Sequence, residues 1–75
     1  MKIDIGNYVR ISADFSADRA LQNQTGNIVA LPTVEHPDEY LVKLDGGISL
    51  NPRFAGRTIR VRASYLELAN QIRRI

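Results

Sequence analysis

The sequence predicts an all-β fold: a small closed barrel of five or six short antiparallel strands with one long early loop. Apolar and polar residues alternate with period two along most of the chain, as they do in half-buried strands. Turn-forming residues separate these segments at short intervals. The chain has 75 residues, so a single domain, 1–75, is expected. Closing a sheet of this size would remove the exposed edges that an open sheet leaves.

The first predicted strand is the segment NYVRISA at 7–13. Its alternation places Val9, Ile11 and Ala13 on one face and polar side chains on the other, which is typical of a half-buried strand. Gly6 precedes the segment, and we expect it to lie in a turn.

A long polar loop is predicted to follow at 14–26. Ser16 has the side chain of a typical N-cap, so we expect it to cap a short helical turn over 17–21. Either Phe15 or Leu21 is expected to fold back onto the core, because a small core needs its large apolar side chains.

The second predicted strand is NIVALPT at 27–33, which ends at Pro32. Gly26 stands just before it, and we expect this glycine to permit a sharp bend of the chain. The next segment, VEHPDE at 34–39, has the residue types of a turn.

A third strand and a hairpin are predicted next. The segment EYLVKLD at 39–45 alternates, and the residues of its apolar face are Tyr40, Val42 and Leu44. Asp-Gly-Gly at 45–47 is a strong hairpin signal. The segment ISL at 48–50 is therefore expected to form a short fourth strand.

In the last third of the chain, a loop with a turn at Gly56 is predicted at 51–57. A fifth strand, TIRVR, is predicted at 58–62. On this strand Ile59 and Val61 are expected to point inward, and the expected outward residues are Thr58, Arg60 and Arg62. The segment 63–69 is expected to form a turn and then a last strand or a single helical turn. The tail at 70–75 is expected to fray.

The composition excludes several classes of site. The chain has no cysteine, so a disulfide or a thiolate metal site is excluded, and the single histidine cannot build a zinc site alone. We expect no metal and no cofactor. No apolar run approaches the roughly 20 residues that span a membrane, and the start of the chain lacks the apolar stretch of a signal peptide. A cytoplasmic protein without a membrane partner is therefore expected. Self-association into a homo-oligomer stays open.

Charge is distributed unevenly along the chain. Residues 1–45 contain four basic and seven acidic residues, a net charge of −3. Residues 46–75 contain six basic residues and one acidic residue, a net charge of +5. Arginine outnumbers lysine eight to two, and arginine binds phosphates and carboxylates with a planar fork. This asymmetry points to an acidic partner.

The chain resembles the SH3-like small β-barrels in four segments: GNYVRI at 6–11, TGNIVAL at 25–31, EYLVKL at 39–44 and IRVRASYLEL at 59–68. The first two segments are similar to the KOW element of ribosomal and transcription proteins. That resemblance implies a barrel that binds RNA.

Two other families have a similar outline. The small SH3-like peripheral subunit of photosystem I resembles the chain in VRI, in Gly-x-Val and in the last strand, which implies an accessory subunit of a larger complex. The plasmid-encoded type II dihydrofolate reductases are SH3-like barrels that form tetramers around a shared pore. Ile59-Arg60-Val61-Arg62 stands where those enzymes have Val-Gln-Ile-Tyr. That resemblance implies an oligomer with a site at its symmetry axis, without the residues of the reductase.

The candidate binding residues are Arg53, Phe54, Arg57, Arg60 and Arg62. Residues two apart on a strand lie about 7 Å apart on one face, which is the scale of neighbouring phosphates on a nucleic-acid strand. An aromatic residue among arginines suits single-stranded nucleic acid. Two alternatives stay open. The arginines would instead pair with Glu67, Asp45 or Glu39, or Phe54 would fold back and cap one end of the barrel.

No residue is predicted to be catalytic. His36 is interpreted as a surface turn residue because it has no nucleophile partner in the sequence. Asp14 and Asp18 are interpreted as solvated loop residues. The predicted function is a non-enzymatic binding module that contacts nucleic acid with little sequence specificity. The alternatives are an adaptor or accessory subunit that contacts an acidic protein surface, and an oligomeric pore-type reductase.

Overall fold

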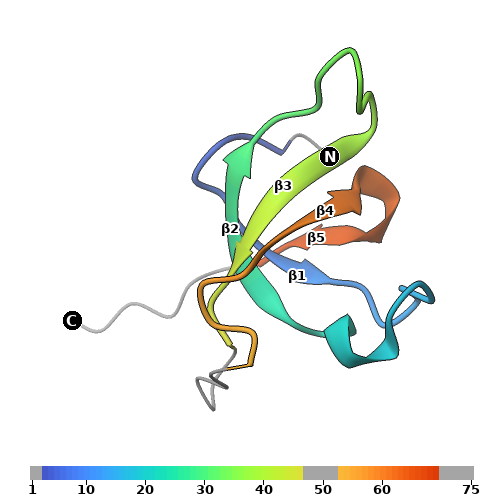
Figure 1. Cartoon of the computed structure of the whole chain (residues 1–75), viewed down its shortest axis with the longest axis vertical. Helices are drawn as coiled ribbons and strands as arrows, with labels where there is room; N and C mark the ends of the chain where they lie inside the picture. The colour runs from blue at the N-terminus through green and yellow to red at the C-terminus, as the bar shows by residue number, and fades with distance from the viewer. Residues whose placement is uncertain (1–2, 47–52, 70–75) are drawn as a thin grey trace.

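The computed structural model describes residues 3–46 and 53–69 and shows an all-β chain (Figure 1). The predicted fold class is therefore confirmed. Five strands and two short 3₁₀ turns make up the described regular structure: β1 (Tyr8–Ile11), η1 (Arg19–Leu21), β2 (Thr25–Ala30), β3 (Glu39–Leu44), β4 (Thr58–Arg62), η2 (Ala63–Tyr65) and β5 (Leu66–Leu68).

The five strands form one antiparallel sheet in the order β4-β3-β2-β1-β5. The first four strands follow one another as a meander, and β5 then returns to pair with β1. Figure 1 shows the sheet strongly curled, with η2 joining β4 to β5. In the part of the chain that the structure describes, β4 and β5 do not pair, and they are the two edge strands of the sheet. The sheet is open at this seam, and closure of the barrel stays a prediction.

The interior is built from the apolar face of every strand, as the period-two alternation predicts. On β1, Val9 and Ile11 are fully buried. Ala13, which was expected beside them, is exposed. The reason is that β1 ends at Ile11 and the chain turns at once. The buried core residues are Ile3, Val9, Ile11, Phe15, Leu21, Ile28, Val42, Leu44, Phe54, Val61 and Leu66.

The early loop contributes both of its large apolar side chains to the core. Phe15 and Leu21 are both buried, and the Phe15 ring packs edge-on against Tyr65 with the ring centroids 5.4 Å apart. The helical turn in this loop is η1, which starts later than predicted. Its cap is Asp18, whose carboxylate oxygen Oδ1 accepts from the backbone N–H of Ala20 at 3.0 Å. The prediction that Ser16 is the cap was wrong.

Gly26 has a different role from the predicted bend. It lies inside β2, paired with Val9 on one side and Leu44 on the other. A Cβ at this position would collide with the backbone carbonyl of Lys43 on β3. Glycine is therefore needed because two strands approach closely, not because the chain turns. The strand ends at Ala30, just before the predicted stop at Pro32.

The third predicted strand is confirmed as β3, with Val42 and Leu44 buried and Tyr40 packed partly buried against the core. Its neighbours in the sheet are β2 and β4. Of the predicted hairpin, Asp45 and Gly46 are described, and Gly46 has the positive φ of 82° that a turn requires. The predicted strand at 48–50 lies outside the described residues, as does the tail at 70–75.

The predicted strand at 58–62 is confirmed residue for residue as β4, followed by a 3₁₀ turn and the short last strand. Inside the described ranges, 3–46 and 53–69, the structure contains no helix long and apolar enough to cross a membrane.

Candidate basic interface

Strand β4 holds two arginines on the outer face of the sheet. Ile59 and Val61 point inward, and Val61 is only 1% exposed, so the strand cannot rotate without exposing it. Arg60 and Arg62 consequently point outward, and both are exposed. Their side chains leave a backbone that is fixed by the ladder to β3, in which Arg60 lies opposite Leu41 and Arg62 opposite Glu39.

Lys43 belongs to the same outer face, although it is not among the predicted site residues. It lies opposite Thr58 in the β3–β4 ladder and is exposed. Cross-strand partners share a face, and diagonal neighbours on that face lie about 7–8 Å apart. Lys43 is therefore diagonal to Arg60. Alternation along β3 predicts that Lys43 points outward, but only the pairing of 39–44 with 58–62 brings it to the arginines.

Arg57 is held at the end of β3 by a compact turn. Its carbonyl oxygen accepts from the N–H of Leu44 at 2.7 Å, and its own N–H donates to the carbonyl of Phe54 at 3.0 Å. Gly56, with a positive φ of 84°, donates to the carbonyl of Leu44 at 2.8 Å. Arg57 is exposed on this fixed backbone.

Phe54 is a core residue. Its side chain is 6% exposed and packs with the buried cluster. This position agrees with the alternative in which Phe54 folds back, since it packs on the core, and its ring is not available as a platform for a base. The Arg53 guanidinium carbon lies 5.7 Å from the centroid of the Phe54 ring, and Arg53 is itself exposed.

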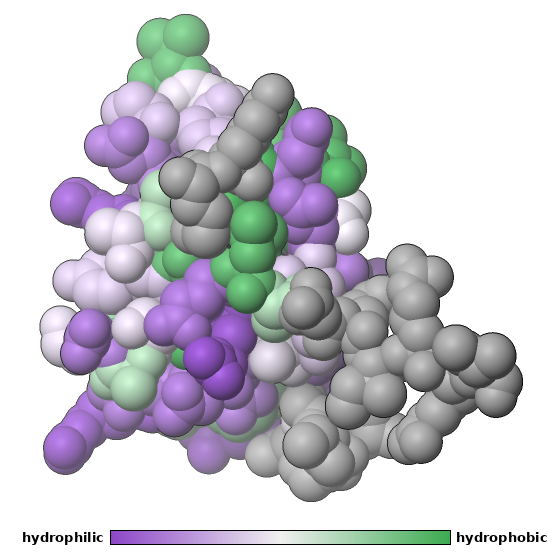
Figure 2. All heavy atoms as spheres, turned by 180° about the vertical axis from the view of Figure 1, so that it is seen from behind, coloured by the Kyte–Doolittle hydropathy of each residue, from purple (hydrophilic) through white to green (hydrophobic). Residues whose placement is uncertain are grey.

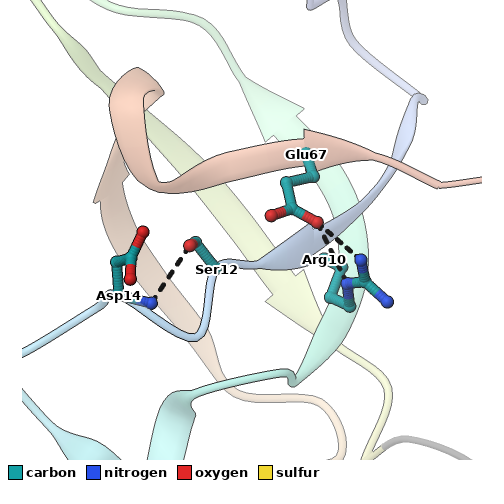
Figure 3. A network of polar contacts seen from close by, with 4 residues as sticks. All are labelled: Arg10, Ser12, Asp14 and Glu67. Carbon is teal, nitrogen blue, oxygen red and sulfur yellow. Dashed lines mark hydrogen bonds and ion pairs between the residues drawn. The ribbon is translucent and has the colours of Figure 1, made fainter.

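Two of the carboxylates predicted as partners of the arginines, Glu67 and Glu39, pair with other residues. Arg10 reaches from β1 to Glu67 on β5, with its Nη2 atom 2.6 Å and its Nε atom 3.2 Å from Oε1 (Figure 3). The imidazole Nδ1 of His36 lies 3.2 Å from Oε1 of Glu39. In the same close-up, Ser12 accepts through its Oγ from the N–H of Asp14 at 3.1 Å.

Asp45 joins three strands at one end of the sheet. Its carboxylate accepts from the Tyr8 hydroxyl at 2.9 Å and from the Thr25 hydroxyl at 2.8 Å. The Thr25 hydroxyl acts to lower the pKa of Tyr8. Burial, the hydrogen bond to Asp45 and the negative charge of Asp45 together outweigh it, so the pKa of Tyr8 is raised. This cluster ties β1 and β2 to the end of β3.

Five exposed cationic side chains have no carboxylate partner among residues 3–46 and 53–69: Arg19, Lys43, Arg57, Arg60 and Arg62. Four of them belong to β3, to β4 or to the turn that leads into β4, and we call these four the basic face: Lys43, Arg57, Arg60 and Arg62. Of the five residues predicted as the site, Arg60 and Arg62 lie on the outward face of β4, and Arg57 is exposed where the preceding turn enters the strand. Arg53 is exposed earlier in that turn, and Phe54 is buried in the core.

Figure 2 shows the molecule from behind, where hydrophilic residues cover most of the coloured surface and hydrophobic residues lie between them in several places. On β2 and just after it, Val29 and Leu31 are 41% and 40% exposed. Over the described parts of the chain, no group of three or more His, Asp or Glu side chains is placed to hold a metal ion.

Comparison with protein families, with curated proteins and with solved structures gives no match for this chain. Its function is therefore inferred from its own residues.

Proposed function

We propose that the chain is a non-enzymatic binding module that holds nucleic acid on its basic face. One observation carries the proposal. Four exposed cations stand on two neighbouring strands and the adjoining turn, while Glu39 and Glu67 pair with other residues. Cations that only keep a surface hydrated are ordinarily interspersed with acidic partners. This face carries four cations and one carboxylate, that of Glu39 opposite Arg62, and such an excess of positive charge creates a field that attracts a polyanion.

Binding would be driven by phosphate contacts. An arginine presents a planar fork of N–H donors that fits a phosphate with two parallel hydrogen bonds. Each phosphate neutralised releases condensed counterions, so affinity falls as salt rises. Four contacts would give a slope of log affinity on log salt of about −3 to −4. Phosphates carry no base identity, so we expect little sequence specificity.

The strand arrangement supports an SH3-like barrel as the scaffold. A four-strand meander whose fifth strand returns to the first is a sheet curled most of the way to closure. We propose that the resemblance in the four sequence segments reflects this arrangement. The scaffold by itself implies no function.

An acidic protein surface is the second candidate partner. Val29 and Leu31 are partly exposed on β2 and just beyond it, and β2 is the strand next to β3. Apolar side chains near a charged rim are what a protein interface uses. An adaptor would capture a discrete protein and little nucleic acid. The oligomeric reductase stays a prediction that a stable tetramer with a bound dinucleotide cofactor would support.

The proposal is tested by titrating the protein into a labelled nucleic acid at low salt and following fluorescence anisotropy. The double variant Arg60→Ala/Arg62→Ala removes two cations from the basic face and should weaken binding at least tenfold, about 0.7 kcal/mol or more for each contact. Arg19→Ala, at an exposed arginine in η1, removes one charge away from the basic face and is the control for an effect of net charge alone. Failure of the unaltered protein to bind at low salt would contradict the proposal.

A further inference from the structure

We infer, on the basis of the proposed function, that the basic face takes duplex nucleic acid in preference to single strands. Two features favour the duplex: the positions of the aromatic side chains in the protein, and the difference in charge density between the two ligands.

All five aromatic residues of the chain fall within the described residues, and each has a structural position. Phe15 and Phe54 are buried, and Tyr40 and Tyr65 pack against the core. Tyr8 is half-buried and donates its hydroxyl to Asp45. The outward positions of β3 and β4 are occupied by aliphatic, polar and charged side chains.

Proteins that bind single strands combine a basic groove with aromatic side chains on which successive bases stack. Stacking contributes about 1–3 kcal/mol for each base. The basic face supplies the charge without such rings. A single strand would gain phosphate contacts here and little from its bases.

A duplex offers this face more. It carries one negative charge per about 1.7 Å of axis, against about 3.4 Å for either of its strands, and it condenses more counterions for release. Arg60 and Arg62 stand about 7 Å apart on β4, which is the scale of neighbouring phosphates along one strand of the duplex. Lys43 lies beside them on β3. A site made of charge alone therefore favours the ligand with the greater charge density.

The test compares a short labelled duplex with one of its own strands under the same salt, again by anisotropy. We expect the duplex to bind about tenfold more tightly, with a salt slope of about −0.9 for each phosphate contact against about −0.7 for the single strand. Equal or tighter binding of the single strand, with loss in Arg60→Ala/Arg62→Ala, would overturn the inference and leave the proposed function standing. Binding of neither ligand would overturn both.

A second measurement tests directly whether bases stack on the protein. A single strand of thymidines is compared with an abasic phosphodiester strand of the same length. Without stacking the two should bind with affinities within about twofold of each other, whereas even one stacked base would separate them by about fivefold or more. A clear preference for the strand with bases would contradict the inference.

Discussion

Gly26 and Lys43 approach so closely across the β2–β3 ladder that a Cβ on Gly26 would collide with the carbonyl oxygen of Lys43. The obstacle is backbone, which cannot swing aside as a flexible side chain can. We predict that Gly26→Ala lowers the free energy of unfolding by about 1–3 kcal/mol, because the strands must separate to admit the methyl group. Urea unfolding measures the change. Val29→Ala, at a partly exposed position on β2, is the control and should cost less than about 1 kcal/mol. Equal stability of Gly26→Ala and the unaltered protein would contradict this account of the glycine.

The cap of η1 provides a second prediction. Asp18→Ala removes the acceptor for the N–H of Ala20 and should destabilise the protein by about 1 kcal/mol. Ser16→Ala should have little effect, because Ser16 is exposed and does not cap the turn. Thermal unfolding of the two variants measures the difference. A larger loss in Ser16→Ala than in Asp18→Ala would contradict the assigned cap.

Because Phe54 is buried, we predict that its substitution affects the stability of the protein and not its affinity for nucleic acid. Phe54→Ala should destabilise the protein by about 3–5 kcal/mol, because it leaves a cavity in the core. Phe54→Leu keeps most of the buried volume, so it should fold and bind nucleic acid as the unaltered protein does. Unfolding and anisotropy titrations of Phe54→Leu test both parts. A folded Phe54→Leu variant that binds much more weakly would show that the ring contacts the ligand.

We predict that ionisation of Tyr8 lowers the stability of the protein at alkaline pH. Its pKa is raised in the folded state, which means that folding favours the neutral phenol. The stability gained from this preference is fully present below the pKa of the unfolded chain, about 10, and is lost as pH rises through the higher folded value. The unfolding free energy should therefore fall as pH is raised above about 10. Tyr8→Phe should show a shallower fall over the same range, and an unchanged alkaline profile in that variant would rule out this contribution.

The sequence predicts the strands better than it predicts how they pair. The alternation in 58–62 identifies β4 and its outward arginines correctly, because the period of two is a local property of the chain. The close approach at Gly26 is a contact between strands and has no local signal. Asp18 and Ser16 are both good caps by residue type, so only the path of the loop decides between them.

The sequence likewise predicts the local part of the candidate site but not the contacts between strands. Arg57, Arg60 and Arg62 stand out as a run of charge, whereas Lys43 joins them only through the β3–β4 register. The burial of Phe54 was one of two alternatives, and the demand of a small core for large apolar side chains decided it. The separation of Glu67 from the arginines of β4 follows from the return of β5 to β1, which a sequence pattern does not reveal.

The salt dependence of nucleic-acid binding is the most direct test of the basic face. Anisotropy titrations of a labelled duplex over a range of salt concentrations give the slope for the unaltered protein and for Arg60→Ala/Arg62→Ala. We predict a slope of about −3 to −4 that becomes shallower by about 2 in the double variant, because two phosphate contacts are removed. Arg19→Ala should keep the original slope. Binding with the same slope in all three proteins would contradict the claim that this face holds the phosphates.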